Sequence, residues 1–417
     1  MKILHTADWH LGKRLYRSDL RDDHTHFLNW LVDIVQQRQI DVLLVSGDIF
    51  DTTNPNDGSM QLYYQFLTRM LPLSVQIVIT GGNHDSATKL NAPKELLRHL
   101  NIHVIGCASG NCVDDVLRFT AGSEDVLVAA IPYLRDADLR QSISGQSYAE
   151  RIEAVRMGIR NHYQHVMDHC YGTHRDVPVV AMGHLYVQGA ATSDSEREIH
   201  AVGGQAAFSS EHFPDGFTYV ALGHIHGPQR VGATDHIRYC GSPIPLSFSE
   251  RDHSHQLLEI TLDNGRLVSV ETVAVPQMRR LRAITGSLEE VREQLEAIEP
   301  DLPLTTLLDI LVEEETESLT TRMHFGQLQR DYAHAPFVLT KTRLQFRNRR
   351  KNLAALFAAE THLADLSHTE VFARRLDLAQ VSGLERDTLT DTFQQLYQMV
   401  TEQSVPVLHE NSANTLS

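Results

Sequence analysis

The first two thirds of the chain alternate short apolar runs with longer stretches whose apolar residues recur every three or four positions. Residues 41–45 and 76–80 are apolar runs of strand length. One longer stretch, 22–37, has the spacing of a helix with one buried face, formed by Phe27, Trp30, Leu31, Ile34 and Val35. Strands that alternate with helices predict an α/β layer architecture, which we assign to residues 1–275.

The same pattern predicts the other elements of this region. Further strands are expected at 2–5, 125–131, 177–182, 217–222, 236–240 and, on both sides of a hairpin turn at 263–265, within 256–275. Helices are expected at 62–71 and 148–167.

The pattern changes after Pro276. Strands at 281–284 and 306–312, with a helix at 288–298 between them, predict a small α+β capping domain over 276–340. A basic segment, 341–351, opens a region that is helical in pattern to residue 405 and is interrupted near Gly383. The polar tail, 406–417, is expected to be disordered.

Composition excludes several classes of protein. Among 417 residues, 42% are hydrophobic, and none of the apolar runs approaches the roughly 20 residues that span a bilayer, so no membrane association is expected. The N-terminus is polar from Lys2, unlike a secretory signal, and the four cysteines form no C-x-x-C pair, as in a cytoplasmic protein with reduced thiols. The net charge of −16 argues against a protein that coats DNA unaided, because phosphate contacts come from Lys and Arg.

Five of the predicted strands end in side chains that can bind metals. Loops at the carboxyl ends of strands converge in α/β proteins, and imidazole with carboxylate suits Mn²⁺, Fe²⁺ or Zn²⁺. One aspartate that bridges two ions would hold them roughly 3.5–4 Å apart, as in two-metal phosphoryl displacement. The candidates, in chain order, are Asp8 with His10, Asp48, Asn83 with His84, His184, and His224 with His226.

Each candidate has an ordinary structural interpretation when it is taken alone. Gly47-Asp48 could be a turn with a helix cap, and His184 could be a polar residue whose hydrogen bonds are satisfied. His224 and His226 would lie on the same face of a strand, a somewhat stronger signal. The occurrence of such groups at five successive strand ends favours a metal centre.

These residues form a pattern that resembles a known family. The motifs Asp8-x-His10, Gly47-Asp48-Ile49-Phe50-Asp51, Gly82-Asn83-His84-Asp85, Gly183-His184 and Gly223-His224-x-His226 resemble those of the calcineurin-like metallophosphoesterases. Residues 5–12, 222–226 and 239–248 are similar to the SbcD family, the nuclease subunits that act with an SbcC-type ATPase in bacteria.

The resemblance implies a four-layered metallophosphoesterase β-sandwich flanked by helices, and a site with two divalent ions, Mn²⁺ by preference. One ion would be bound by Asp8, His10, Asp48 and His226, and the other by Asp48, Asn83, His184 and His224. His84, polarised by Asp85, would face the phosphate as a catalytic group. Asp51 stands where archaeal relatives have a second histidine that does not bind metal, so its role is left open.

The resemblance also implies a double-strand exonuclease and hairpin or end endonuclease, active in DNA end processing and repair. The helical region 341–405 would dock onto the coiled coil of the ATPase, within a heterotetramer that contains a homodimer of this chain. A phosphatase, a cyclic-nucleotide phosphodiesterase and a DNA-end-binding scaffold with a vestigial site are alternatives. The tail helices could instead pack on one another or on the first domain, and the basic segment could be a solvated helix face.

Overall fold

The computed structural model describes residues 1–109, 111–139, 147–193, 195–196, 201–202, 205–206, 208–232, 234–347, 368–379 and 381–403. The chain divides into two compact units, Met1–Gln345 and Phe346–Ser417. Each unit is described by itself. The first unit contains two six-stranded sheets and a smaller three-stranded sheet.

The first sheet has the strand order β16-β15-β1-β4-β5-β6. Its central strands β1, β4, β5 and β6 run parallel, while β15 and β16 are antiparallel to their neighbours. Its strands are β1 (Lys2–Thr6), β4 (Val42–Ser46), β5 (Gln76–Thr80), β6 (Ile102–Ile105), β15 (Gln256–Asp263) and β16 (Arg266–Ala274).

The second sheet has the strand order β13-β14-β12-β9-β8-β7. Strands β8, β9, β12 and β14 run parallel, and β7 and β13 pair antiparallel at the two edges. Its strands are β7 (Val116–Ala121), β8 (Glu124–Ala129), β9 (Val179–His184), β12 (Phe217–Gly223), β13 (Gln229–Arg230) and β14 (Ile237–Tyr239).

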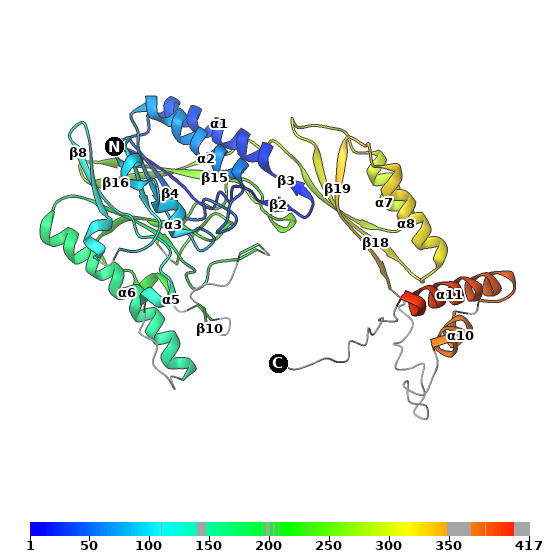
Figure 1. The fold of residues 1–417 in the computed structure, drawn as a ribbon. Coiled ribbons are helices and arrows are strands. Elements are labelled where there is room, and N and C mark those ends of the chain that lie inside the picture. Colours follow the sequence, from blue (N-terminus) through cyan, green and yellow to red (C-terminus); the bar gives the residue numbers. More distant parts are fainter. Residues whose placement is uncertain are drawn as a thin grey trace, which may run out of the picture. The chain divides into compact units, whose positions relative to one another are not determined.

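The two sheets pack face to face and are covered by helices on their outer faces, as predicted (Figure 1). Alternate residues of β4 belong to different layers: Val42 and Leu44 pack between the sheets, and Leu43 and Val45 pack under α1 (Arg21–Arg38) and α2 (Asp57–Met70). Helix α6 (Tyr148–Thr173) covers the second sheet. Because the inner strands β4, β9 and β12 are buried on both faces, they are nearly continuous apolar runs in the sequence.

Short elements complete this part of the chain. They are β2 (Arg14–Leu15), β3 (Ser18–Asp19), α3 (Ala87–Asn91), α4 (Lys94–Arg98), α5 (Asp136–Leu139), β10 (Ala201–Val202), β11 (Gln205–Ala206) and the 3₁₀ turns η1 (Leu71–Leu73), η2 (Cys112–Asp115), η3 (Ser210–His212) and η4 (Phe248–Glu250).

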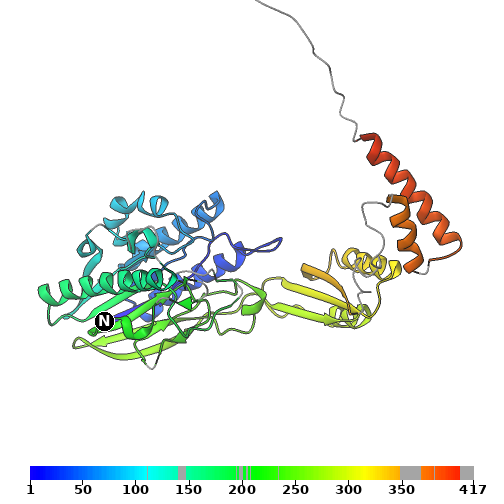
Figure 2. The same cartoon turned by 90° about the horizontal axis from the view of Figure 1, so that it is seen from below.

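The small sheet lies mostly within residues 276–340, the span predicted as a capping domain, and has the order β17-β18-β19. Its elements are β17 (Leu281–Gly286), α7 (Leu288–Glu296), β18 (Thr306–Glu314), α8 (Leu319–Asp331) and β19 (Phe337–Phe346). Figure 2 shows both helices on one face of the sheet. This module is joined to the first domain by an ion pair between Arg279 and the Asp23 carboxylate, with Nε at 2.9 and 3.0 Å from its oxygens.

Strand β19 continues past the boundary that we expected at residue 340. Residues 341–346 of the basic segment therefore belong to a strand, not to a helix face. Two of its cations pair with Asp309 of β18: Arg343 Nη2 lies 2.9 Å from the carboxylate and Lys341 Nζ lies 4.0 Å from it. These pairs reduce the positive charge that this segment presents to solvent.

The second unit contains α10 (His368–Leu378) and α11 (Leu384–Gln403). The two helices pack on each other, because the ring of Phe372 stacks on that of Phe393 with centroids 4.0 Å apart and Leu376 is buried. Leu396 is 57% exposed. Residues 348–367, 380 and 404–405 of the predicted helical region, and the tail 406–417, lie outside the described residues.

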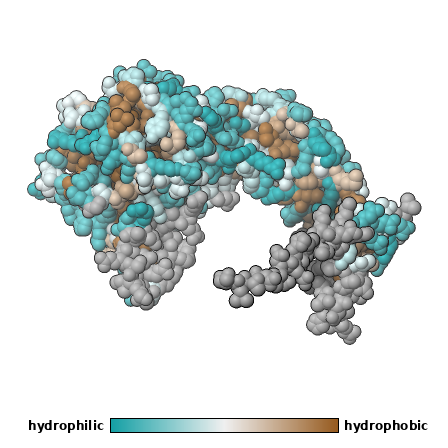
Figure 3. Space-filling model, in the orientation of Figure 1, coloured by the Kyte–Doolittle hydropathy of each residue, from teal (hydrophilic) through white to brown (hydrophobic). Residues whose placement is uncertain are grey.

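The described surface of the first unit is mainly hydrophilic, with hydrophobic residues in separate patches on the face that Figure 3 shows. Within the described residues, no helix combines the length and apolar character that a bilayer span requires.

Candidate metal centre

The loops that carry the predicted ligands lie at one edge of the two packed sheets. Strands β1, β4 and β5 are parallel in the first sheet, and β9 and β12 are parallel in the second. Their carboxyl ends therefore open into a common region, where the side chains that follow each strand can meet.

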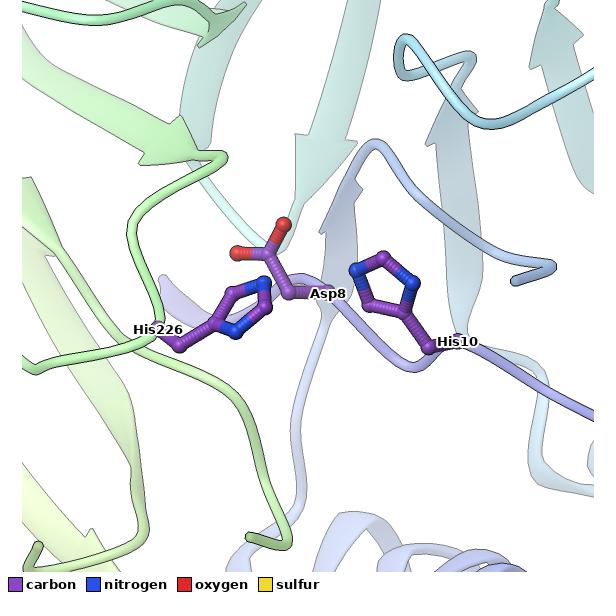
Figure 4. A group of neighbouring side chains, drawn as sticks. All are labelled: Asp8, His10 and His226. Carbon is purple, nitrogen blue, oxygen red and sulfur yellow. The ribbon is translucent and has the colours of Figure 1, made fainter. Parts of the chain in front are cut away.

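Three groups of side chains in this region could each hold a metal ion. The possible ligand atoms within each group lie within 4.8 Å of one another, and all of the residues are buried. Figure 4 shows Asp8 and His10 on one loop and His226 on another, with the three side chains close together. The three groups are Asp8 with His10 and His226, His10 with Asp48 and His84, and Asp48 with His184 and His224.

Asp48 belongs to two of these groups and lies at the centre of the site. Its Oδ2 is 3.4 Å from His10 Nε2 and 3.4 Å from His184 Nε2. Asn83 joins the same cluster, because its Oδ1 lies 2.9 Å from His184 Nε2. One carboxylate thus contacts imidazoles on both sides, as a bridging ligand requires.

The backbone at the site is held in an uncommon conformation. Asp8, His10, Asp48 and His224 have φ angles of 55°, 47°, 48° and 96°, in a region that non-glycine residues rarely adopt. Backbone hydrogen bonds hold them there: Asp8 N donates to Gly47 O at 3.1 Å, and His10 N donates to Asp48 O at 2.9 Å. Such strain concentrates at functional sites, where it aims side chains that regular strands would direct elsewhere.

The predicted placement of His224 and His226 on one strand face is wrong. Strand β12 ends at Gly223, and both histidines lie in the following loop. The backbone N–H of His224 donates to both oxygens of Asp8, at 2.9 and 3.0 Å. The turn that these bonds stabilise places the imidazoles of His224 and His226 in different groups of possible metal ligands.

The electrostatics of the cluster favour cations. Burial would raise the pKa of Asp48, but the neighbouring His184 and His10 hold it well below its usual value. Burial raises the pKa of Asp8 to about 7. Burial would lower the pKa of His184, but Asp48 and Asp8 outweigh it and raise the value to about 9. The two buried carboxylates thus favour protonation of the groups around them. Bound metal ions would supply the same positive charge in place of these protons.

These residues fit divalent transition metals. His10 Nε2 is fully buried and has no hydrogen-bond partner in the described part of the chain, although it faces Asp48. A buried imidazole nitrogen that faces a carboxylate has the geometry expected of a metal ligand. Imidazoles, carboxylates and one amide oxygen form a donor set that suits borderline divalent ions.

His84 lies at this cluster, but Asp85 does not contact it in the predicted way. The Nδ1 of His84 lies 2.7 Å from the backbone carbonyl oxygen of Asp51. The Asp85 carboxylate instead accepts hydrogen bonds from the backbone N–H groups of Ile49, Phe50 and Gly82, at 3.1, 2.9 and 2.9 Å. Asp85 therefore ties the loop after β4 to the loop after β5.

Asp51, whose role the sequence left open, contacts two histidines of the site. Its carboxylate lies 3.3 Å from His10 Nδ1 and 3.2 Å from Lys13 Nζ, and its carbonyl oxygen faces His84. One residue thus orients two histidines of the site.

Sequence analysis missed two acidic residues next to His226. Glu250 is fully buried and lies 3.0 Å from His226 Nδ1, and Glu196 accepts the His226 backbone N–H at 2.9 Å. Glu250 lies two residues after the end of the segment 239–248, whose family resemblance was noted without a role. The closeness of Glu250 to this segment was the signal in the sequence that could have identified it.

Comparisons with known proteins match most of the length of the chain. Residues 1–228 match the model of the calcineurin-like phosphoesterase family, and residues 277–380 match a domain described as the type 5 capsule protein repressor C-terminal domain (SbcD_C).

Curated relatives cover most of the chain. The SbcD subunit of the nuclease SbcCD from Escherichia coli (strain K12) is 34% identical over 94% of this chain and 97% of its own length. The proteins of the same name from Rhodobacter capsulatus and Bacillus subtilis are each 35% identical. They cover 73% and 64% of this chain, and 77% and 67% of their own lengths, respectively.

Proposed function

Since the chain belongs to the calcineurin-like phosphoesterases and, within them, to the family of SbcD nuclease subunits, we propose that it is a two-metal DNA nuclease. Its substrates would be double-stranded DNA ends and hairpins, and its role the processing of DNA ends in repair. The observation that carries this proposal is the position of Asp48, which contacts His10 on one side and His184 on the other.

The contacts on the two sides of Asp48 support the ligand sets that the family resemblance implies. We assign one ion to Asp8, His10, Asp48 and His226, and the other to Asp48, Asn83, His184 and His224. The mixture of nitrogen and oxygen donors suits Mn²⁺ as the working ion. When bound, the two ions would supply Lewis-acid activation of the phosphate and of the attacking water.

His84 is assigned the proton transfer. Because a carbonyl oxygen only accepts, the bond to Asp51 O requires a proton on His84 Nδ1. The Nε2 is left to exchange a proton with the substrate, and in its protonated form it would donate to the leaving oxygen. Asp85 supports this role indirectly, by holding the two loops that carry Asp48 and His84.

An SbcC-type ATPase is the partner that the family implies, and the second unit supplies a surface for it. The packing of α10 on α11 covers the side chains of Phe372 and Leu376, whereas Leu396 is exposed on α11. We assign this exposed side of α11 to contact with the coiled coil of the ATPase. The assembly would be a heterotetramer built on a homodimer of this chain.

A three-substrate assay tests the proposed activity. The purified chain, with and without its ATPase partner and ATP, is incubated with Mn²⁺ and labelled hairpin DNA, a phosphopeptide or a cyclic nucleotide. We expect hydrolysis of the hairpin DNA, with loss of that activity in Asp48→Ala. Preferred hydrolysis of the phosphopeptide or the cyclic nucleotide would favour a phosphatase or a small-molecule phosphodiesterase. DNA binding with no hydrolysis would favour a scaffold.

A further inference from the structure

Glu250 is a buried carboxylate that the proposed reaction does not use. It belongs to η4 and has no exposed surface. Its Oε2 accepts the backbone N–H of Leu246 at 2.8 Å and lies 3.4 Å from the hydroxyl oxygen of Ser242. Its Oε1 faces the imidazole of His226, with Nδ1 at 3.0 Å. A carboxylate with this many donors is held in a single orientation.

Serine hydroxyls surround the same oxygen. The hydroxyl oxygens of Ser193 and Ser247 lie 3.0 and 3.2 Å from Glu250 Oε1, and Ser195 donates to it. The segment 239–250 thus meets Ser193 and Ser195 at a single buried oxygen. Residues so far apart in the chain converge on one buried oxygen, which indicates that these contacts are part of the architecture of the site and not a chance surface contact.

These contacts determine which nitrogen of His226 carries the proton. The Ser195 oxygen lies 2.8 Å from His226 Nδ1, but its one hydrogen is donated to Glu250. Both Ser195 and the carboxylate therefore present lone pairs to Nδ1, which must be the N–H donor. Nε2 is then the unprotonated nitrogen, the form in which imidazole binds a metal.

The backbone of His226 is fixed from two further directions. Its N–H donates to Glu196 Oε1 at 2.9 Å, and its carbonyl accepts the N–H of Ser242 at 3.0 Å. Gly241 has a φ of 82° and packs against that carbonyl, since a Cβ there would stand 2.6 Å from the oxygen. Backbone and ring are therefore both immobilised before any ligand binds.

We propose that Glu250 is a positioning residue that fixes the tautomer and the ring orientation of His226, so that Nε2 is presented to the ion assigned to Asp8, His10 and Asp48. The inference rests on the ligand assignment proposed above. It also gives a role to the segment 239–248, which forms the pocket in which the Glu250 carboxylate is held.

The arrangement differs between the two halves of the metal centre. His184, on the other side of Asp48, has its Nδ1 3.0 Å from the backbone carbonyl of Ser46, which is neutral. A carboxylate behind a ligand histidine increases its basicity more than a carbonyl does, and raises metal affinity. Loss of the Glu250 carboxylate should therefore weaken the binding of one ion and leave the binding of the other unchanged.

Metal titration of the full chain tests this inference. Glu250→Gln keeps the size of the side chain and one acceptor oxygen but removes the charge. Glu259→Gln is the matched control, because Glu259 is also buried and pairs with Arg38 at 2.7 Å, on strand β15. His226→Ala serves as the reference for loss of the ligand itself.

Each protein is equilibrated with chelator-buffered Mn²⁺, and bound metal is counted by mass spectrometry. Circular dichroism checks the fold, and the visible absorption of the Co²⁺-loaded protein reports the ligand geometry. For Glu250→Gln we expect the affinity for one of the two ions to fall by about 10- to 100-fold, with an altered Co²⁺ spectrum. Glu259→Gln should bind both ions as the unsubstituted chain does.

The outcomes separate this inference from the ligand assignment. If His226→Ala keeps both ions, the assignment of His226 is wrong. If His226→Ala loses one ion while Glu250→Gln binds two with unchanged affinity, Glu250 only packs against the loop and the inference is overturned. If Glu250→Gln fails to fold, Glu250→Asp decides by the same measurement, because it keeps the charge but withdraws the carboxylate from Nδ1.

Discussion

Gly82 lies directly against the carboxylate of Asp48. A Cβ at position 82 would overlap Asp48 Oδ1, the oxygen to which the backbone N–H of His84 donates at 2.9 Å. The loop after β5 can therefore reach the loop after β4 only if position 82 has no side chain. This close approach sets the orientation of the carboxylate that we propose as the bridge between the two ions.

Gly82→Ala should displace Asp48 and reduce the bound metal to less than two equivalents per chain, because even one methyl group cannot be accommodated beside Oδ1. Gly172→Ala is the control, since a Cβ there meets no atom within 4 Å. Mass spectrometry of the metal-loaded proteins measures the effect. Full metal content in Gly82→Ala would show that the loop can shift without cost.

His84→Gln should retain both ions and DNA binding but lose cleavage. Glutamine can still reach the Asp51 carbonyl, yet it cannot transfer a proton, so we expect a rate reduction of about 100-fold or more. Single-turnover cleavage of a labelled hairpin, beside a metal count on the same sample, makes the distinction. A normal rate would restrict His84 to a supporting hydrogen bond, whereas loss of metal would make it a ligand.

Leu396→Glu should weaken the complex with the ATPase by about tenfold or more, because it places a charge in a proposed apolar contact. Phe372→Glu should instead unfold the α10–α11 pair, since Phe372 stacks on Phe393. Met323→Glu, at a 64% exposed position of α8, controls for the added charge. Size-exclusion chromatography and circular dichroism separate these effects. Unchanged complex formation by Leu396→Glu would remove this side of α11 from the interface.

His5 should make the stability of the metal-free protein depend on pH. Burial lowers its pKa from 6.5 to about 3, so between these values the unfolded chain binds a proton that the folded chain does not. The stabilising contribution is present above pH 6.5 and is lost as the pH falls toward 3. His5→Gln should reduce the slope of unfolding free energy against pH by up to about 1.4 kcal/mol per unit in this window.

Urea unfolding in the presence of a chelator, at several pH values from 4 to 7, measures this slope without interference from metal release. Parallel curves for the two proteins would mean that His5 titrates normally in the folded state.

Much of the fold follows from local patterns. The strand predicted at 76–80 coincides with β5, and the helix predicted at 22–37 corresponds to α1. The elements that were missed have weak patterns for a physical reason. Helix α8 buries Leu328 but exposes Leu319 and Met323, so its apolar residues do not mark one face.

The sequence by itself also determined which side chains could form the site. Asp8, Asp48, Asn83, His184 and His224 each lie at or just after the end of a strand, and both the strand ends and the donor chemistry of these residues are local properties. Parallel strands end at a common edge, so the convergence of these groups could be expected from the sequence.

Only the tertiary structure decided how each donor is oriented. His184 meets the Ser46 carbonyl 138 residues away, His84 faces Asp51 and not the adjacent Asp85, and Glu250 is placed behind His226 by a buried pocket. Such pairings depend on how loops from different strands pack and on strained turns such as that at His224. Hydrogen bonds between groups distant in the chain leave no periodic signal in the sequence, so the choice of tautomer and partner is decided only when the sheets are brought face to face.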